Sequence, residues 1–134
     1  MTLKIRVIAP DKIVWDADAE EIILPSSTGQ LGILSGHIPL LTALDIGVMR
    51  VRINNEWKPI ILLGGFAEIN NNTVIILVNG AEMVSEIDIE DAKKSLEEAT
   101  QLVNSAKTNK EKIEATQVLR KAKARIQASN VLVT

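Results

Sequence analysis

The spacing of the apolar residues changes near residue 85, and this change separates two parts of the chain that must fold differently. In residues 3–9 apolar and polar side chains alternate, which is the period of a half-buried strand. From Asp88 onward apolar residues recur at intervals of three and four, the spacing of one helix face. We therefore predict a β domain over residues 1–85 and a helical domain over residues 86–134.

The first domain consists of short apolar runs separated by turn residues. Asn54-Asn55-Glu56 and Asn70-Asn71-Asn72 are predicted hairpin loops, because asparagine tolerates a left-handed backbone. Glycines and prolines interrupt the stretch from Pro25 to Leu44, which predicts short strands joined by tight turns. No long helical pattern lies among these runs, so we expect an antiparallel β-sandwich of about ten short strands.

The second domain is predicted to be an antiparallel hairpin of two helices. The first helix begins near Asp88, with Ser85 or Asp88 as its N-cap and acidic side chains in its first turn. The second helix runs from about Glu111 to Ala128. Two helices joined by a short loop pack side by side in opposite directions. The predicted fold class is therefore β plus α, a sandwich followed by a helical hairpin.

The facing sides of the two helices are rich in alanine, which affects how firmly the hairpin is held. An alanine seam lets helices approach closely but buries little apolar area, and each buried Leu, Ile or Val contributes only about 1.5–3 kcal/mol. This composition favours a movable element. The alternative is a hairpin that docks on the sandwich and stays there. The alanines are Ala92, Ala99, Ala106, Ala115 and Ala122.

Composition argues against several classes of site. The chain has no cysteine and one histidine, His37, so thiol chemistry and clustered His or Cys metal sites are not expected. The acidic pairs Glu20-Glu21 and Glu97-Glu98 are adjacent in sequence, and adjacent side chains diverge in a strand or a helix. No apolar run approaches the roughly 20 residues that span a bilayer, and the N-terminus is not a secretory signal. We predict no catalytic and no metal-binding residue.

Four basic residues lie within six positions of the second helix: Arg120, Lys121, Lys123 and Arg125. We call them the basic cluster. The simplest interpretation is a solvated face, and the alternative is a surface that docks on an acidic partner. Nucleic-acid binding would favour aromatic side chains for stacking, and this segment has none. An acidic protein therefore fits better than nucleic acid.

Two motifs carry a resemblance to a known family. Gly29-Gln30-Leu31-Gly32-Ile33-Leu34, followed by His37-Ile38-Pro39-Leu40, resembles the epsilon subunit of F-type ATP synthase, as does Gly64-Gly65-Phe66-Ala67-Glu68. The resemblance runs along the whole chain and is closest to the chloroplast and cyanobacterial branch. It implies a noncatalytic rotor subunit of the central stalk, bound to the gamma subunit and to the polar loops of the c-ring. The subunit would couple ring rotation to the catalytic head.

The resemblance also implies contact residues and a location. The ring-contacting loop of the family corresponds here to Thr28, Gly29, Gln30 and Leu31, with His37 close by. The protein would lie on the cytoplasmic or stromal face of a thylakoid or other energy-coupling membrane, held there only through the complex.

In this family the helical hairpin regulates. It either folds against the sandwich or extends into the catalytic head, where its basic second helix meets acidic residues of the catalytic beta and alpha subunits and blocks ATP hydrolysis. This role falls here on the basic cluster. Two alternatives remain open: a free-standing sandwich adaptor whose basic helix binds another acidic protein, and a small hydrolase that uses His37.

Some bacterial members bind ATP on the folded hairpin through the motif Ile/Leu-Asp-x-x-Arg-Ala together with arginines of the second helix. The corresponding stretch here is Ile89 to Lys94, where Glu, Lys and Lys replace Asp, Arg and Ala. Lysine does not reproduce the planar fork of guanidinium. The resemblance therefore implies at most a weak ATP site, at Glu90, Lys93, Arg120 and Arg125, and no other cofactor.

Overall fold

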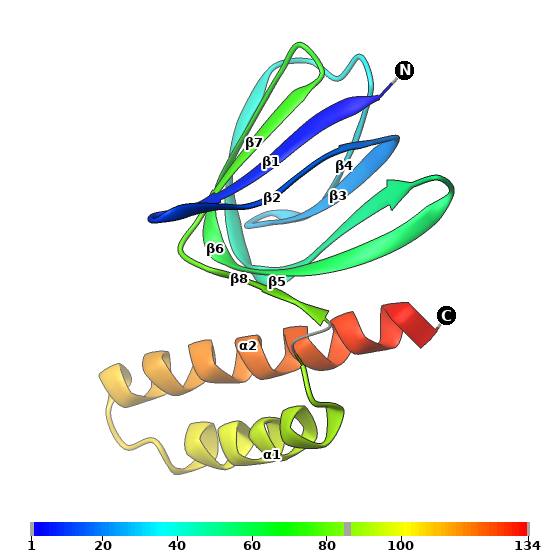
Figure 1. Ribbon diagram of the computed structural model, residues 1–134. Helices are drawn as coiled ribbons and strands as arrows, with labels where there is room; N and C mark the ends of the chain where they lie inside the picture. The colour runs from blue at the N-terminus through cyan, green and yellow to red at the C-terminus, as the bar shows by residue number, and fades with distance from the viewer. Residues whose placement is uncertain (1, 85–86, 134) are drawn as a thin grey trace.

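A computed structural model describes residues 2–84 and 87–133, and in this part of the chain eight strands are followed by two helices (Figure 1). The helices are α1 (Ile89–Ser105) and α2 (Asn109–Val133). The strands are β1 (Leu3–Ala9), β2 (Lys12–Ala19), β3 (Glu21–Ser26), β4 (Gly29–Leu34), β5 (Leu40–Ile53), β6 (Glu56–Asn70), β7 (Thr73–Val78) and β8 (Ala81–Met83).

The prediction of about ten short strands is wrong. β5 and β6 are 14 and 15 residues long, so each is a single strand much longer than the short strands that were expected. The sheet is also not wholly antiparallel, because β1 pairs in parallel with β7. The strand order is β2-β1-β7-β6-β5-β3-β4, with β8 pairing with β6 beside this path.

One continuous sheet makes both layers of the sandwich, and it folds over where β5 and β6 each have an unpaired residue. Leu44 pairs with Gly65 and Ile46 pairs with Leu63, so Asp45 and Gly64 are left out of the register. One residue of each strand is skipped at the same point, so the register is the same on both sides of it, and the face that points inward changes in both strands together. In β6 the inward residues are accordingly Ile60 and Leu62 before this point and Ala67 and Ile69 after it.

Gly65 is required at this fold because the backbones approach closely. Its φ is 149°, and a Cβ atom at this position would lie 2.0 Å from the carbonyl oxygen of Leu77 and 2.8 Å from the Cα of Val78. Both atoms belong to the backbone of β7, which is held in the ladder with β6 and cannot move aside alone.

The core between the two layers is aliphatic, as the composition requires. Seventeen buried residues form it, among them Leu3, Ile22, Met49 and Ile76. Both predicted asparagine turns are confirmed: Asn54, Asn55, Asn71 and Asn72 all have positive φ between 52° and 63°. This is the left-handed conformation that a tight two-residue hairpin turn demands.

The two helices form the predicted hairpin and lie together below the sandwich (Figure 1). Asp88 is the N-cap of α1, since its carboxylate accepts from the backbone N–H groups of Glu90 and Asp91; Ser85 lies outside the described residues. α2 begins at Asn109, two residues before the predicted start, and continues beyond Ala128 to Val133. Four of the five seam alanines are buried, and Ala106 is half-buried.

A second apolar face of α2 docks on the outer surface of the sandwich. Ala124 and Ala128 are buried against Val48 of β5 and Ile61 of β6. Leu63, Val84 and Ile87 surround this small cluster. This face was not predicted, although Ala124 and Ala128, four residues apart in a helix, are a sequence signal for it.

Candidate functional site

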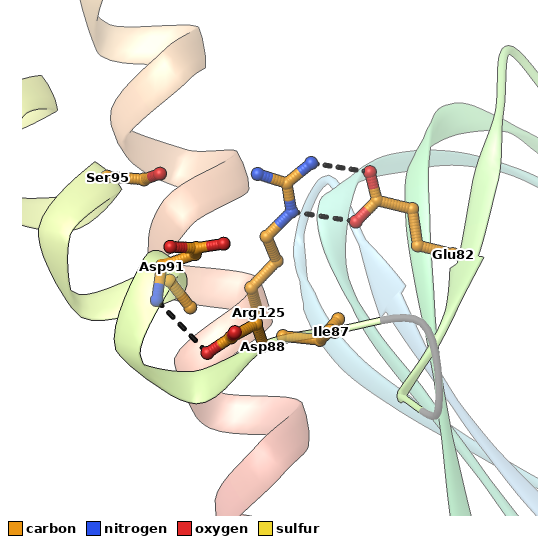
Figure 2. Close-up of a pocket in the computed structure, with 7 residues that line it drawn as sticks. Glu82, Ile87, Asp88, Asp91, Ser95 and Arg125 are labelled. Carbon is orange, nitrogen blue, oxygen red and sulfur yellow. Dashed lines mark hydrogen bonds and ion pairs between the residues drawn. The ribbon is translucent and has the colours of Figure 1, made fainter.

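The contact between the sandwich and the helical hairpin contains a cavity of about 270 Å³. Figure 2 shows the side chain of Arg125 crossing from α2 to Glu82 of β8, with Asp88, Asp91 and Ser95 on the α1 side. The residues that line the cavity come from β8, the linker and both helices: Glu82, Ile87, Asp88, Asp91, Ala92, Ser95 and Arg125.

Glu82 and Arg125 form a bidentate ion pair at this contact. The Nε and Nη2 atoms of Arg125 donate to the two carboxylate oxygens of Glu82 at 2.8 Å and 2.6 Å. The Nζ of Lys121 lies 3.6 Å from the same carboxylate. The side chain of Glu82 is 20% exposed, so water screens this pair less than it screens a surface pair.

The protonation equilibria of the pair are shifted in the directions that this geometry requires. Hydrogen bonds from Arg125, helped by the positive charges of Arg125 and Lys121, hold the pKa of Glu82 below its usual value, while partial burial opposes them. The hydrogen bond to Glu82 raises the pKa of Arg125. The pair is therefore fully ionised at neutral pH.

These shifts predict how docking depends on pH. A carboxyl whose pKa is depressed in the docked state stabilises that state above its ordinary pKa, about 4.3, and loses this effect as pH falls through the depressed value. We expect docking to be constant from about pH 6 to 9 and to weaken below about pH 4. The distance between spin labels at Glu56→Cys on β6 and Gln127→Cys on α2 measures it.

Other charged groups surround Glu82, so the acid titration needs a variant that lacks this carboxylate. Lys121 and Arg125 of α2 face Glu82, and Asp88 and Asp91 of α1 line the same cavity. The same acid titration in Glu82→Gln isolates the contribution of Glu82. An acid-induced release of equal size in that variant would contradict the assignment to Glu82.

The structure divides the basic cluster into two pairs. Lys121 and Arg125 point to Glu82 and are partly buried. Arg120 and Lys123 are exposed on the other side of α2. The predicted contact surface is therefore only half presented while the hairpin is docked. The pairing of Glu82 with Arg125 was not predicted, because the two residues lie 43 positions apart and no local sequence pattern links them.

The four residues of the predicted weak ATP site are not brought together. Only Arg125 lines the cavity; the other three predicted residues, Glu90, Lys93 and Arg120, do not. Arg120 lines a different hollow on the outer face of α2, with Asn109 and Lys112 among its neighbours.

The nucleotide motif, expected at Ile89 to Lys94, fits the sequence better two residues earlier. Ile87-Asp88-x-x-Asp91-Ala92 fits Ile/Leu-Asp-x-x-Arg-Ala with one departure, and these four residues line the cavity. The departure places the carboxylate of Asp91 where the motif has a guanidinium. A carboxylate repels phosphate, so aspartate at the arginine position of the motif weakens anion binding more than a lysine there would.

The predicted ring-contacting loop lies at the turn between β3 and β4. Thr28, Gly29 and Gln30 are exposed there, and Leu31 is partly buried against the core. The buried hydroxyl of Ser26 lies 3.2 Å from the hydroxyls of both Thr28 and Thr42 and holds the turn in shape. Arg50 donates to the side-chain oxygen of Gln30 at 2.9 Å.

His37 is not part of this turn. It follows the other end of β4, where its Nδ1 lies 2.7 Å from the carbonyl oxygen of Ile38. The neighbouring Gly36 donates to the side chain of Asn72 in the β6–β7 turn at 2.7 Å. The length of β4, about 17 Å for six residues, separates His37 from Gly29.

An exposed apolar row crosses the outer face of the sandwich layer that does not contact the helices. Phe66 pairs with Leu77, which pairs with Ile8, and these residues continue the row to both neighbouring strands. Phe66 is 57% exposed and Leu77 is 52% exposed. We call this feature the apolar row; it contains Ile13, Ile8, Leu77, Phe66 and Ala43 on five adjacent strands.

The apolar row is a candidate interaction surface. Within residues 2–84 and 87–133, no three His, Cys, Asp or Glu side chains gather closely enough to hold a metal ion. Over the same residues, neither helix is both long and apolar enough to cross a membrane. The fold and these surfaces define a two-domain protein, a β-sandwich with an exposed apolar row and a docked helical hairpin.

Comparisons with known proteins identify the family. Residues 2–84 match the family described as ATP synthase, Delta/Epsilon chain, beta-sandwich domain, and residues 85–130 match its long alpha-helix domain. The chain belongs to the delta/epsilon chain family of ATP synthase, and within it to the epsilon chains of the chloroplast and cyanobacterial type. This membership makes it a noncatalytic subunit.

Individual relatives cover nearly the whole chain. It is 71% identical over 132 residues to the chloroplastic ATP synthase epsilon chain of Gracilaria tenuistipitata var. liui, with 98% of each chain covered. It is 57% identical over 136 residues to the ATP synthase epsilon chain of Trichodesmium erythraeum (strain IMS101), with 99% of each covered.

Among solved structures, the fold resembles a chain of the mitochondrial ATP synthase of Euglena gracilis. The TM-score is 0.82 at 22% identity, covering 99% of this chain and 82% of that one. A chain of the central stalk and c-ring structure from Tetrahymena thermophila matches at a TM-score of 0.62 and 17% identity, covering 96% and 97%. These two likenesses concern the fold alone.

Proposed function

We propose that this protein is a central-stalk subunit that couples rotation of the c-ring to the gamma subunit and the catalytic head, and that its hairpin inhibits ATP hydrolysis. Residues 1–85 would make the rotor contacts and residues 86–134 would regulate. The observation that carries the proposal is the division of surfaces: the apolar row and the basic cluster lie on different domains. The protein would lie on the stromal or cytoplasmic face of the thylakoid membrane, attached through the rest of the complex.

The apolar row is the proposed contact with the gamma subunit. Its exposed side chains lie on five paired strands, so the surface is rigid and presents a fixed shape. The face of the other layer is covered by α2, which leaves the apolar row accessible in the docked state. Exposed aromatic and aliphatic side chains at the centre of a patch are the usual anchors of a protein interface.

The turn at Thr28–Leu31 is the proposed contact with the polar loops of the c-ring. Its polar, exposed side chains suit a partner that is itself polar, and the Ser26 hydroxyl contacts keep the turn rigid enough to transmit force. A contact that also includes His37 must extend along β4.

The basic cluster is the proposed inhibitory contact with the catalytic subunits. Two of its cations are exposed even when the hairpin is docked, and all four become available if the hairpin leaves the sandwich. The small docking cluster supports such a movement, since alanine supplies half of its buried residues. The cavity at Arg125 would bind ATP weakly at most, because three carboxylates line it.

Replacing Arg120 and Lys123 by alanine tests the inhibitory role without disturbing the contact to Glu82. We expect inhibition of the soluble head to weaken about three- to thirtyfold, because each of the two charged contacts at a partly exposed interface is worth about 0.3–1 kcal/mol. The loss should be larger at low salt, where screening is weaker. The measurement is ATP hydrolysis against added subunit concentration.

The matched control is Lys93→Ala with Lys94→Ala, which removes the same charge from exposed positions of α1. The control should inhibit like the unmodified protein. Equal inhibition by both double variants would show that helix bulk, and not the charge of α2, causes the inhibition.

A further inference from the structure

Glu82 occupies the last strand before the helical hairpin. β8 has three residues, and it is followed by the linker that leads to Asp88 and α1. Ile61 of β6 pairs with Glu82 and also belongs to the cluster against which α2 docks. The carboxylate is therefore fixed by a sheet ladder at the point where the two domains meet.

The rest of the docking contact is small. Its buried members are two alanines from α2 and Val48 and Ile61 from the sandwich. Alanine contributes little on burial, and the gain from Val48 and Ile61 is that of two side chains. The bidentate, partly buried ion pair adds to this small apolar contact, around which Leu63, Val84 and Ile87 are partly buried.

Glu82 also pairs with two cations that would otherwise be exposed. Arg125 gives it two hydrogen bonds and Lys121 lies within 3.6 Å. Arg120 and Lys123 lie one to five residues from these two cations on the same helix and remain exposed. The docked state therefore conceals one half of the basic cluster and presents the other half.

We propose that Glu82 is a latch that competes within the chain for Lys121 and Arg125, holding the hairpin docked and masking these cations from an acidic protein partner. The carboxylate of Glu82 stands in for a carboxylate of the partner. Docking and full engagement of the partner then exclude each other. The link to inhibition rests on the function proposed above, whereas the latch itself concerns the isolated chain.

A latch predicts different partner binding for variants at the two ends of the ion pair. Removing the carboxylate releases the hairpin and leaves both cations free to bind. Removing Arg125 also releases the hairpin but takes away one of the cations. A merely structural contact would give the same result for both variants, because both lose the same ion pair.

The first experiment measures docking by the spin-label pair at positions 56 and 127. In Glu82→Gln and in Arg125→Ala the ratio of docked to released hairpin should fall about tenfold or more, as expected for the loss of a charge-assisted bidentate contact. Glu98→Gln, which removes an exposed acid from α1, is the charge-matched control and should leave the ratio unchanged. The exchanged pair Glu82→Arg with Arg125→Glu should restore docking.

The second experiment measures binding of a poly-glutamate peptide to the same proteins. Glu82→Gln should bind it several-fold more tightly than the unmodified protein, and Arg125→Ala should bind it more weakly. Unchanged docking in Glu82→Gln, or equal peptide affinity in the two variants, would overturn the latch. A third outcome separates the two proposals. If both results are as expected but Glu82→Gln inhibits ATP hydrolysis no more strongly than the unmodified protein, the latch is supported and the inhibitory function is contradicted.

Discussion

Replacing Phe66 and Leu77 by threonine is expected to lower the affinity for the gamma subunit about a hundredfold. The two side chains form a cross-strand pair at the centre of the apolar row and are more than half exposed in the isolated chain. Burying each against a partner contributes about 1.5–3 kcal/mol, and threonine removes most of that apolar area. Threonine also keeps the strand preference of the site, so the sandwich should remain folded.

Leu34→Thr provides the matched control for this prediction. Leu34 is 52% exposed, the same fraction as Leu77, and it also lies in a strand, but β4 is outside the apolar row. The affinity, measured by titration of purified gamma subunit, should be unchanged in this variant. An equal loss in Leu34→Thr and in the double variant would contradict the assignment of the apolar row.

Gly65→Ala is expected to destabilise the sandwich by about 4 kcal/mol, which is most of the stability of an ordinary small domain. The added Cβ would meet the Leu77 carbonyl oxygen at 2.0 Å, and neither strand can yield without breaking the ladder. Urea unfolding followed by tryptophan fluorescence measures this domain, because Trp15 and Trp57 both lie in strands of the sandwich.

Gly32→Ala is the control for the glycine prediction. Gly32 also lies in a strand, but a Cβ there would meet no atom within 4 Å. Its urea midpoint should stay close to that of the unmodified protein. If the two alanine variants unfolded at the same urea concentration, the close approach at Gly65 would not be a constraint on the fold.

Local features of the fold were predictable from the sequence because they depend on local spacing. The change of period near residue 85, the asparagine turns and the alanine seam each follow from residues a few positions apart. The number of strands was overestimated for the same reason: a bend inside β5 and β6 looks like a chain break when the cross-strand register is unknown.

Features that join distant segments were not predictable in this way. The apolar row becomes visible only when five strands are placed in register. The pairing of Glu82 with Arg125 depends on where α2 docks, and no periodicity in α2 identifies β8 as its partner. The basic cluster was found from sequence, but its division into a masked and an exposed pair comes from tertiary structure.

We expect inhibition of ATP hydrolysis only when the hairpin can leave the sandwich, and a reversible cross-link between the two domains measures this. The chain has no cysteine, so Ile61→Cys in β6 and Ala128→Cys in α2 introduce a unique pair within the docking cluster. Bound to the soluble catalytic head, the oxidised protein should leave hydrolysis uninhibited, and reduction should restore inhibition. Equal inhibition by the oxidised and reduced forms would contradict the account.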